Sequence, residues 1–156
     1  GGRVVWGCSA FFFFLQKAPY GFDVSVWEFC WPLMTGSTLV LAGAGEHKDS
    51  QRLIELINEY KVTTLHFVPA MLQVFLDNPD ANSCVSLSRI FCSGEALPYQ
   101  LQQQCLSSLT AELHNLYGPT EASIDVTYWD CRKQHIKDVV PVGFPIPNIQ
   151  TSNLDS

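Results

Sequence analysis

The feature that most constrains the fold is an alternation, from about residue 17 onward, of short apolar runs with longer amphipathic stretches. Strands joined through helices in this way form βαβ units, which build a largely parallel sheet with helices packed on both of its faces. We find no internal repeat and no linker of low complexity. The sequence therefore predicts one α/β unit, with strands near residues 38–42, 63–68, 89–93, 111–116 and 124–129.

Start signals mark the helices between these runs. Asp49 or Ser50 can cap a helix over residues 50–60, whose apolar residues form one stripe. Proline favours the first turn of a helix, so Pro69 and Pro98 indicate helices from these points to about residues 76 and 109.

Three other segments carry weaker signals. Residues 24–35 are apolar around most of a helix circumference, which predicts a buried helix ending near Gly36. The proline-rich residues 141–147 predict irregular structure. Residues 11–15 form an apolar run too short to span a bilayer, so we expect a buried strand or an artefact at the edge of a fragment. Because the chain begins with Gly, we expect a fragment, with residues 1–13 of doubtful authenticity.

Composition narrows the class of function. The 156 residues are 47% hydrophobic and 15% charged, as in a globular domain with a real core. The net charge of −6 argues against nucleic-acid and membrane partners, which leaves a small-molecule site as the default. The six cysteines form no C-x-x-C pair, so we expect free thiols in a reducing, cytoplasmic compartment.

A polar loop follows the predicted strand at residues 111–116, at the strand end where ligands bind in parallel sheets. In this loop Tyr117 offers a flat face for a base, Gly118 permits a tight turn, Thr120 offers a hydroxyl and Glu121 offers a carboxylate for Mg²⁺. The alternative is a Gly-Pro turn with solvated polar ends, which the five residues alone favour.

Four ordered blocks of sequence decide between these interpretations. Residues 114–121 (HNLYGPTE) closely resemble the N-x-Y-G-P-T-E signature of amino-acid adenylation domains in the acyl-adenylate-forming (AMP-binding) superfamily. Residues 22–28 (FDVSVWE) resemble its substrate-binding block, residues 93–97 (SGEAL) its turn at the adenine, and residues 142–155 its I-G-x-P-I to L-D segment. The resemblance covers roughly residues 15–156 and identifies the chain as a partial adenylation domain of a nonribosomal peptide synthetase.

The resemblance implies a fold and a reaction. The fold is part of the large N-terminal subdomain of an AMP-forming synthetase. The reaction activates an amino acid with ATP and Mg²⁺ to an aminoacyl-adenylate and passes it to phosphopantetheine on a peptidyl carrier, beside a condensation domain. The family's phosphate loop lies upstream of the covered region, and its ribose-binding aspartate and C-terminal lysine lie downstream. We therefore expect this piece alone to be inactive.

The resemblance also implies roles for residues around the nucleotide. Tyr117 would stack on adenine, Asn115 would read the adenine edge, and Thr120 and Glu121 would be catalytic, the first at the α-phosphate and the second holding Mg²⁺. The resemblance also implies that four further residues line the nucleotide site, where glycine lets the backbone approach the nucleotide closely: Gly94, Glu95, Ala96 and Gly118.

The side-chain pocket is implied in the same way. Asp23 would pair with the substrate's ammonium group. In order, the pocket positions resemble the family's serine-type pocket, with a phenylalanine replacing a leucine: Asp23, Val24, Trp27, His66, Phe91, Ser93, Leu116, Ile124 and Asp125. We expect serine as substrate, threonine as the leading side activity and poor activation of alanine. We also expect Asp23, His66, Ser93, Tyr117 and Asp125 to converge on one cleft.

Two alternatives remain open at this point. An acyl-CoA synthetase of the same superfamily would keep the nucleotide loop, although it would not need the ammonium partner Asp23. A non-catalytic α/β scaffold would need neither the nucleotide loop nor the ammonium partner. His66 alone would more often be a core histidine satisfied by a neighbour than a substrate ligand.

Overall fold

The computed structural model describes residues 13–16, 23–43, 45–118, 126–132 and 139–147. These residues form a seven-stranded sheet in the order β2-β1-β3-β4-β5-β6-β7. The strands are β1 (Phe13–Gln16), β2 (Thr38–Leu41), β3 (Thr64–Phe67), β4 (Arg89–Cys92), β5 (Glu112–Tyr117), β6 (Thr127–Asp130) and β7 (Phe144–Pro145).

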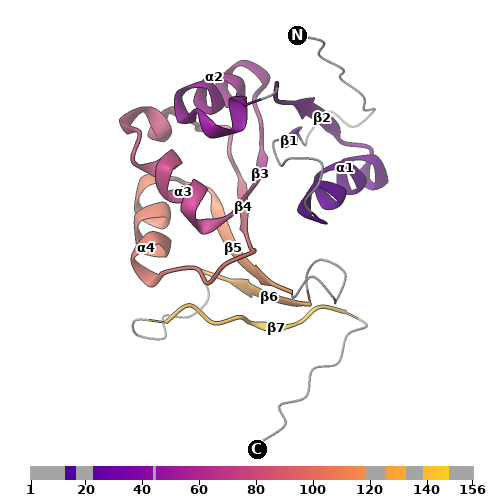
Figure 1. Ribbon diagram of the computed structural model, residues 1–156, viewed down its shortest axis with the longest axis vertical. Coiled ribbons are helices and arrows are strands. Elements are labelled where there is room, and N and C mark those ends of the chain that lie inside the picture. The colour runs from indigo at the N-terminus through magenta and orange to yellow at the C-terminus, as the bar shows by residue number, and fades with distance from the viewer. Residues whose placement is uncertain (1–12, 17–22, 44, 119–125, 133–138, 148–156) are drawn as a thin grey trace, which may run out of the picture.

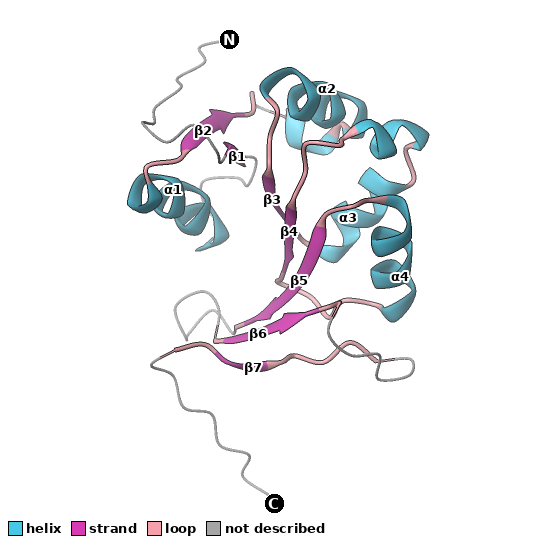
Figure 2. Cartoon of the chain, turned by 180° about the vertical axis from the view of Figure 1, so that it is seen from behind, coloured by secondary structure: helices cyan, strands magenta, loops and turns pink. Residues whose placement is uncertain are grey.

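The sheet is parallel from β2 to β5 and antiparallel at its β6–β7 end. The helices are α1 (Asp23–Thr35), α2 (Ser50–Tyr60), α3 (Pro69–Leu76) and α4 (Tyr99–Ser108), with short 3₁₀ helices η1 (Glu46–Lys48) and η2 (Pro79–Ser83). Figure 1 shows α2, α3 and α4 together on one side of the sheet and α1 on the other, and Figure 2 shows the same layers from behind. The predicted parallel-rich sheet with helices on both faces is confirmed.

The main core lies between the sheet and α2, α3 and α4. Side chains in a strand alternate between the two faces, and one set of β3, β4 and β5 residues joins helix residues in this core. That set is Leu65, Phe67, Ile90, Cys92 and Leu113, which cluster with Leu72, Phe75, Leu101 and Cys105. The alternate residues, among them His66, Phe91 and His114, therefore face away from these helices.

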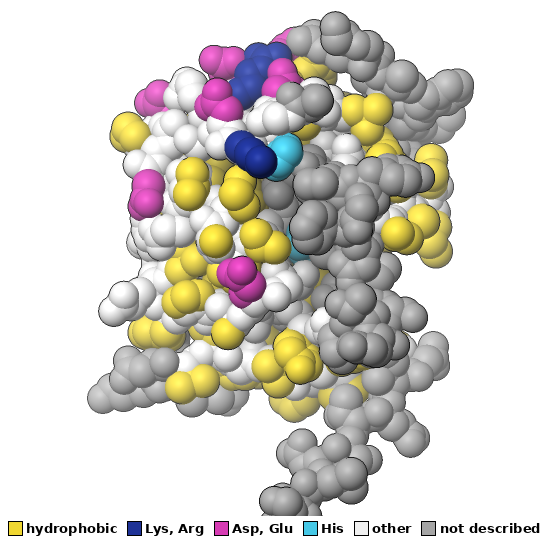
Figure 3. Space-filling view, viewed as in Figure 1, with side chains coloured by type: hydrophobic (Ala, Val, Ile, Leu, Met, Phe, Trp, Pro, Cys, Tyr) yellow, Lys and Arg dark blue, Asp and Glu magenta, His cyan; other side chains and the backbone are white. Residues whose placement is uncertain are grey.

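Helix α1 is where the burial prediction is wrong. Figure 3 shows apolar side chains gathered at the edge of the molecule formed by α1. Trp31 is 43% exposed, Leu33 69% and Met34 85%. Among the described elements, α1 makes its main contacts with β1 and β2, and these three apolar side chains stay exposed.

The proline-rich segment is more regular than predicted. Residues 144–145 form β7, which pairs antiparallel with β6. Gly143 precedes β7 with a φ of 90°, and a Cβ there would lie 2.0 Å from the backbone oxygen of Tyr128. Only glycine fits this close approach of two backbones, so a glycine fixes where the last strand joins the sheet.

The cysteines behave as the sequence predicts in the described residues. Cys30, Cys84, Cys92, Cys105 and Cys131 are all free thiols. Burial raises the pKa of Cys105 and Cys131 to about 12, so these thiols are protonated at neutral pH. No helix in the described ranges is long and apolar enough to cross a membrane.

Helix α2 begins at the predicted cap. The Asp49 carboxylate accepts hydrogen bonds from the backbone N–H groups of Gln51 (3.0 Å) and Arg52 (3.2 Å). In the full-length protein we expect Asp49→Ala to lower the free energy of unfolding by about 1 kcal/mol, because these donors lose their partner. Chemical denaturation measures this. Asp49→Asn keeps the cap and should cost far less; equal losses for both variants would contradict the capping role.

Candidate active site

A cavity of about 300 Å³ lies at the carboxyl ends of β4 and β5. This volume is at the lower end of the roughly 300–1,000 Å³ typical of small-molecule sites. Two chain segments form most of its wall, and a third closes it: residues 94–97, residues 115–118, and Val140 with Val142. Six of the predicted nucleotide-binding residues thus line one cavity: Gly94, Glu95, Ala96, Asn115, Tyr117 and Gly118.

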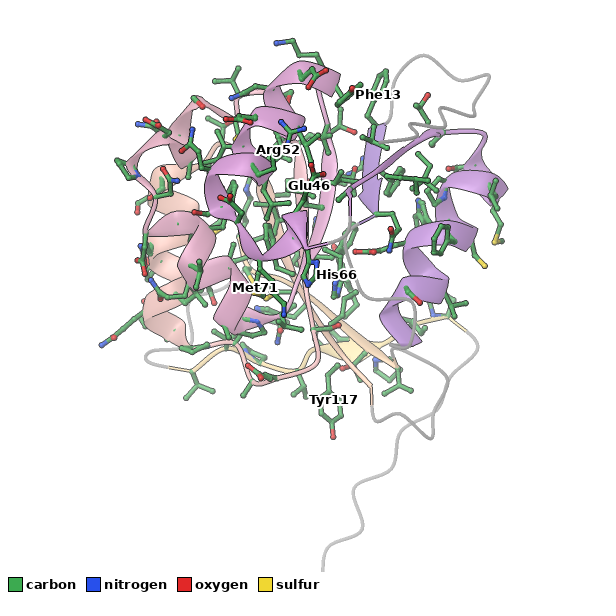
Figure 4. All side chains as sticks on the ribbon, turned by 45° about the horizontal axis from the view of Figure 1, so that its top comes forward. Phe13, Glu46, Arg52, His66, Met71 and Tyr117 are labelled. Atoms are coloured by element: carbon green, nitrogen blue, oxygen red, sulfur yellow. The ribbon has the colours of Figure 1, made fainter. Side chains whose placement is uncertain are left out.

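Tyr117 is the aromatic residue of this cavity. It ends β5, and its side chain is 50% exposed. Figure 4 shows it projecting from the carboxyl end of the strand. A half-exposed ring beside an apolar, backbone-rich hollow suits a planar base, which can cover the ring on one face. The described residues therefore fit an adenine group at this position.

Gly94 also lines the cavity. It follows β4 with a φ of 87°, a conformation that side-chain-bearing residues rarely adopt, and a Cβ there would lie 3.2 Å from Val68 Cγ1. The turn it makes brings the backbone of Glu95 and Ala96 to the cavity. A larger residue at position 94 would both strain the turn and press on Val68, the residue that caps the start of α3.

Asn115 has a role that sequence reasoning missed. Its side chain is 5% exposed, and its Nδ2 donates a hydrogen bond to the backbone oxygen of Pro141 at 3.0 Å. The amide nitrogen thereby ties β5 to the segment that carries Val140 and Val142. The amide nitrogen is therefore engaged within the protein. The Oδ1 atom is the one that can accept a hydrogen bond from a ligand. No sequence signal links two residues 26 positions apart with this register.

The predicted pocket residues His66 and Ser93 meet on the sheet face turned away from α2, α3 and α4. His66 Nε2 and Ser93 Oγ lie 2.8 Å apart in a hydrogen bond. The side chains are almost fully buried, at 4% and 2% exposure. Figure 4 shows His66 near the middle of the molecule, whereas Tyr117 lies at its edge. A buried imidazole and hydroxyl that satisfy one another form a small polar spot in an apolar region.

Strand β5 separates the cavity from this polar spot. Asn115 and Tyr117 line the cavity. Successive side chains of a strand point to opposite faces, so His114 and Leu116 lie on the face shared with Phe91 and Ser93. The strand therefore presents Asn115 and Tyr117 on one face and His114 and Leu116 on the other, although Leu116 also lines the cavity beside Tyr117.

Seven predicted site residues lie outside the described residues or are placed only by their backbone. Thr120, Glu121, Ile124 and Asp125 lie outside the described residues. Asp23, Val24 and Trp27 lie in α1, and the description of these residues stops at their place in the helix. Of the five residues expected to converge, the structure brings His66 and Ser93 into contact. In the described part of the chain no group of three or more His, Cys, Asp or Glu side chains could hold a metal ion.

We call the sheet face that carries His66, Phe91 and Ser93 the pocket face. A second polar group on this face was not predicted. His114 on β5 is 5% exposed, and its Nδ1 lies 2.8 Å from the hydroxyl of Tyr128 on β6. Its ring also stacks on Phe91, with the ring centres 5.2 Å apart. Burial lowers the pKa of His114 despite the nearby carboxylates of Asp130 and Glu112, so the ring is neutral at pH 7.

Comparison with known sequences assigns the family. The model of the AMP-binding enzyme family matches residues 4–156. Vanchrobactin synthetase VabF of Vibrio anguillarum is 47% identical over 152 residues, which cover 91% of this chain and 5% of that protein. Phosphinothricin tripeptide synthetase PhsB of Streptomyces viridochromogenes is 49% identical over 160 residues, covering 99% of this chain and 13% of that protein. The chain thus spans a small part of the curated relatives it matches.

The solved structures agree with the sequences. The Vibrio cholerae adenylation domain AlmE, in complex with glycyl-adenosine-5'-phosphate, superposes with a TM-score of 0.74 at 28% identity. The match covers 88% of this chain and 26% of that chain. The shared fold is that of the N-terminal part of an adenylation enzyme, as the four sequence blocks predict. The chain therefore belongs to the AMP-binding enzyme family, among the adenylation domains of the nonribosomal peptide synthetase type.

Proposed function

We propose that the protein containing this chain activates L-serine. The serine carboxylate attacks the α-phosphate of ATP, pyrophosphate leaves, and seryl-AMP forms. The seryl group then passes to the phosphopantetheine thiol of a carrier domain, with release of AMP. A condensation domain of the same synthetase would use the resulting thioester.

The cavity beside Tyr117 supports the nucleotide part of this proposal. Adenine stacks on the exposed face of Tyr117, and the Asn115 Oδ1 accepts a hydrogen bond from the exocyclic amine. Gly94 has no side chain, so the base can approach the backbone of this turn closely. Thr120 at the α-phosphate and Glu121 with Mg²⁺ complete the proposed nucleotide site, on the strength of the family signature.

The buried pair of His66 and Ser93 is the observation that carries the choice of serine. A hydroxyl has one donor and two acceptor positions, so Ser93 can bond both the His66 ring, 2.8 Å away, and a substrate hydroxyl. Phe91 and Leu116 are bulky and apolar, so in this proposal they leave room only for a small substrate side chain. Asp23 would hold the substrate's ammonium group, with Val24, Trp27, Ile124 and Asp125 around the side chain.

The test is amino-acid-dependent ATP–pyrophosphate exchange by the complete adenylation domain, across the twenty amino acids. We expect serine to give the highest kcat/KM, threonine to follow and alanine to be activated poorly, because a pocket built around a hydroxyl leaves its polar groups unpaired with alanine. Transfer of labelled serine to a holo carrier domain tests the second step. Preference for an aliphatic or aromatic amino acid would contradict the proposal.

A single substitution tests the polar pair. His66→Ala should lower serine-dependent exchange by about tenfold, the loss of one hydrogen-bonding partner, and change alanine-dependent exchange much less. Thr64→Val is a matched control, because Thr64 lies on the same strand and is equally buried. Equal losses for serine and alanine in His66→Ala would indicate a structural role for this histidine instead.

A further inference from the structure

Three stacked rings lie side by side on the pocket face of the sheet. The Phe91 and His114 rings are 5.2 Å apart at an interplanar angle of 27°. The His114 and Tyr128 rings are 5.3 Å apart at 26°. The three residues come from the adjacent strands β4, β5 and β6, so we call them the cross-strand stack. Only Phe91 belongs to the pocket that the sequence predicts.

Hydrogen bonding fixes the middle ring of the cross-strand stack. His114 Nε2 lies 3.4 Å from the carboxylate oxygen Oε2 of Glu112, and its Nδ1 lies 2.8 Å from the Tyr128 hydroxyl. A carboxylate only accepts hydrogen bonds, so Nε2 carries the proton of the neutral ring. Nδ1 then accepts the hydrogen bond that the Tyr128 hydroxyl donates. With both nitrogens engaged, the imidazole cannot flip or rotate without losing a bond.

We propose that His114 and Tyr128 are positioning residues, which set the size limit of the substrate pocket by holding the Phe91 ring in place. The proposal rests on the proposed function, in which Phe91 forms a wall of the side-chain pocket. A phenylalanine on a sheet face has room to change its χ1 or χ2 rotamer unless a neighbour blocks it. His114 blocks the Phe91 ring on one side, and Tyr128 in turn supports His114.

The chemistry of the stack explains why its middle member is a histidine. An aliphatic residue would pack against Phe91 but could not be fixed in rotation from two sides. The imidazole is flat, so it stacks on both neighbours, and its two nitrogens tie it to β6 and to Glu112. Arg89 and Arg132 each lie 3.8 Å from the Glu112 carboxylate and form ion pairs with it beside the ring.

The test is the ratio of threonine to serine in kcat/KM, measured by exchange on the complete adenylation domain. His114→Ala removes the support behind Phe91, so the pocket widens and the ratio should rise by about tenfold, within the range that one methyl group is worth in a pocket. Tyr128→Phe keeps the stacked ring but frees His114 to rotate, and should give a smaller rise. His114→Phe keeps a flat ring but loses both hydrogen-bonding partners, so its ratio should fall between those of His114→Ala and the wild type.

The matched control is Leu113→Ala. Leu113 is the neighbouring residue on β5, fully buried, and it faces the helices instead of the pocket. Its truncation should destabilise the domain at least as much as His114→Ala yet leave the threonine-to-serine ratio unchanged. A folded His114→Ala variant with an unchanged ratio would overturn the proposal, and so would a Leu113→Ala variant whose ratio rises equally.

A second readout does not depend on serine activation. With ring-labelled phenylalanine, the Phe91 signal is identified by its loss in Phe91→Leu, and His114→Ala should shift and broaden it while Leu113→Ala should not. If the wild type prefers another amino acid, the serine assignment is wrong. The size limit is then decided by the ratio of that amino acid to its homologue with one more methyl group.

Discussion

Replacing Phe67 by alanine in the complete adenylation domain is expected to lower the free energy of unfolding by about 3–5 kcal/mol. Phe67 ends β3, is 0% exposed and lies with its ring 5.3 Å from that of Phe75 on α3. Its removal leaves a cavity between the sheet and α3 that the fixed strand backbone cannot fill. Denaturant unfolding followed by tryptophan fluorescence gives the change.

Two variants complete this measurement. Phe67→Leu keeps most of the buried volume and should cost clearly less than Phe67→Ala. Val74→Ala is the surface control, because Val74 lies on α3 but is 48% exposed, and its effect should stay within about 0.5 kcal/mol. Near-equal stability of Phe67→Ala and the wild type would mean that the core between β3 and α3 is not packed as described.

Replacing Tyr117 by alanine is expected to weaken ATP binding by up to about a hundredfold, since stacking of one base on an aromatic ring is typically worth about 1–3 kcal/mol. Tyr117 is half exposed beside the cavity, so its loss should leave the fold intact. The KM for ATP in pyrophosphate exchange and the Kd for ATP by calorimetry should rise together.

The conservative variant separates stacking from other causes. Tyr117→Phe retains the ring face and should bind ATP nearly as well as the wild type. The KM for the amino acid should stay nearly constant in both variants, because Tyr117 does not lie on the pocket face of β5. A large loss of amino-acid affinity without loss of ATP affinity would contradict the assignment of this cavity to the nucleotide.

The elements of the fold could be predicted where a local signal marks them. Asp49 caps α2, Pro69 opens α3, and Pro98 immediately precedes α4. The buried parallel strands appear as apolar runs because both of their faces are covered. Strand β7 and the antiparallel direction of β6 were not predicted, since a two-residue strand beside prolines carries no periodic signal.

Side-chain contacts between neighbouring strands could not be predicted from the sequence. The hydrogen bond from Asn115 to Pro141 and the stack of His114 on Tyr128 depend on the register of β5 with β6 and on the turn that follows. Register is set by the packing of the whole sheet, and a single sequence does not contain it. The meeting of His66 with Ser93 was predicted as proximity in one pocket, but only the structure gives the direct bond.

The alternation of β5 has a consequence for how such domains can be redesigned. A substitution at His114 alters one face of the strand and leaves Asn115 and Tyr117 on the other face, so we expect it to change selectivity for the amino acid without loss of nucleotide binding. A change in length acts differently. Insertion or deletion of one residue within β5 would turn every later side chain to the opposite face. Libraries built on this strand should therefore vary residue identity and keep its length constant.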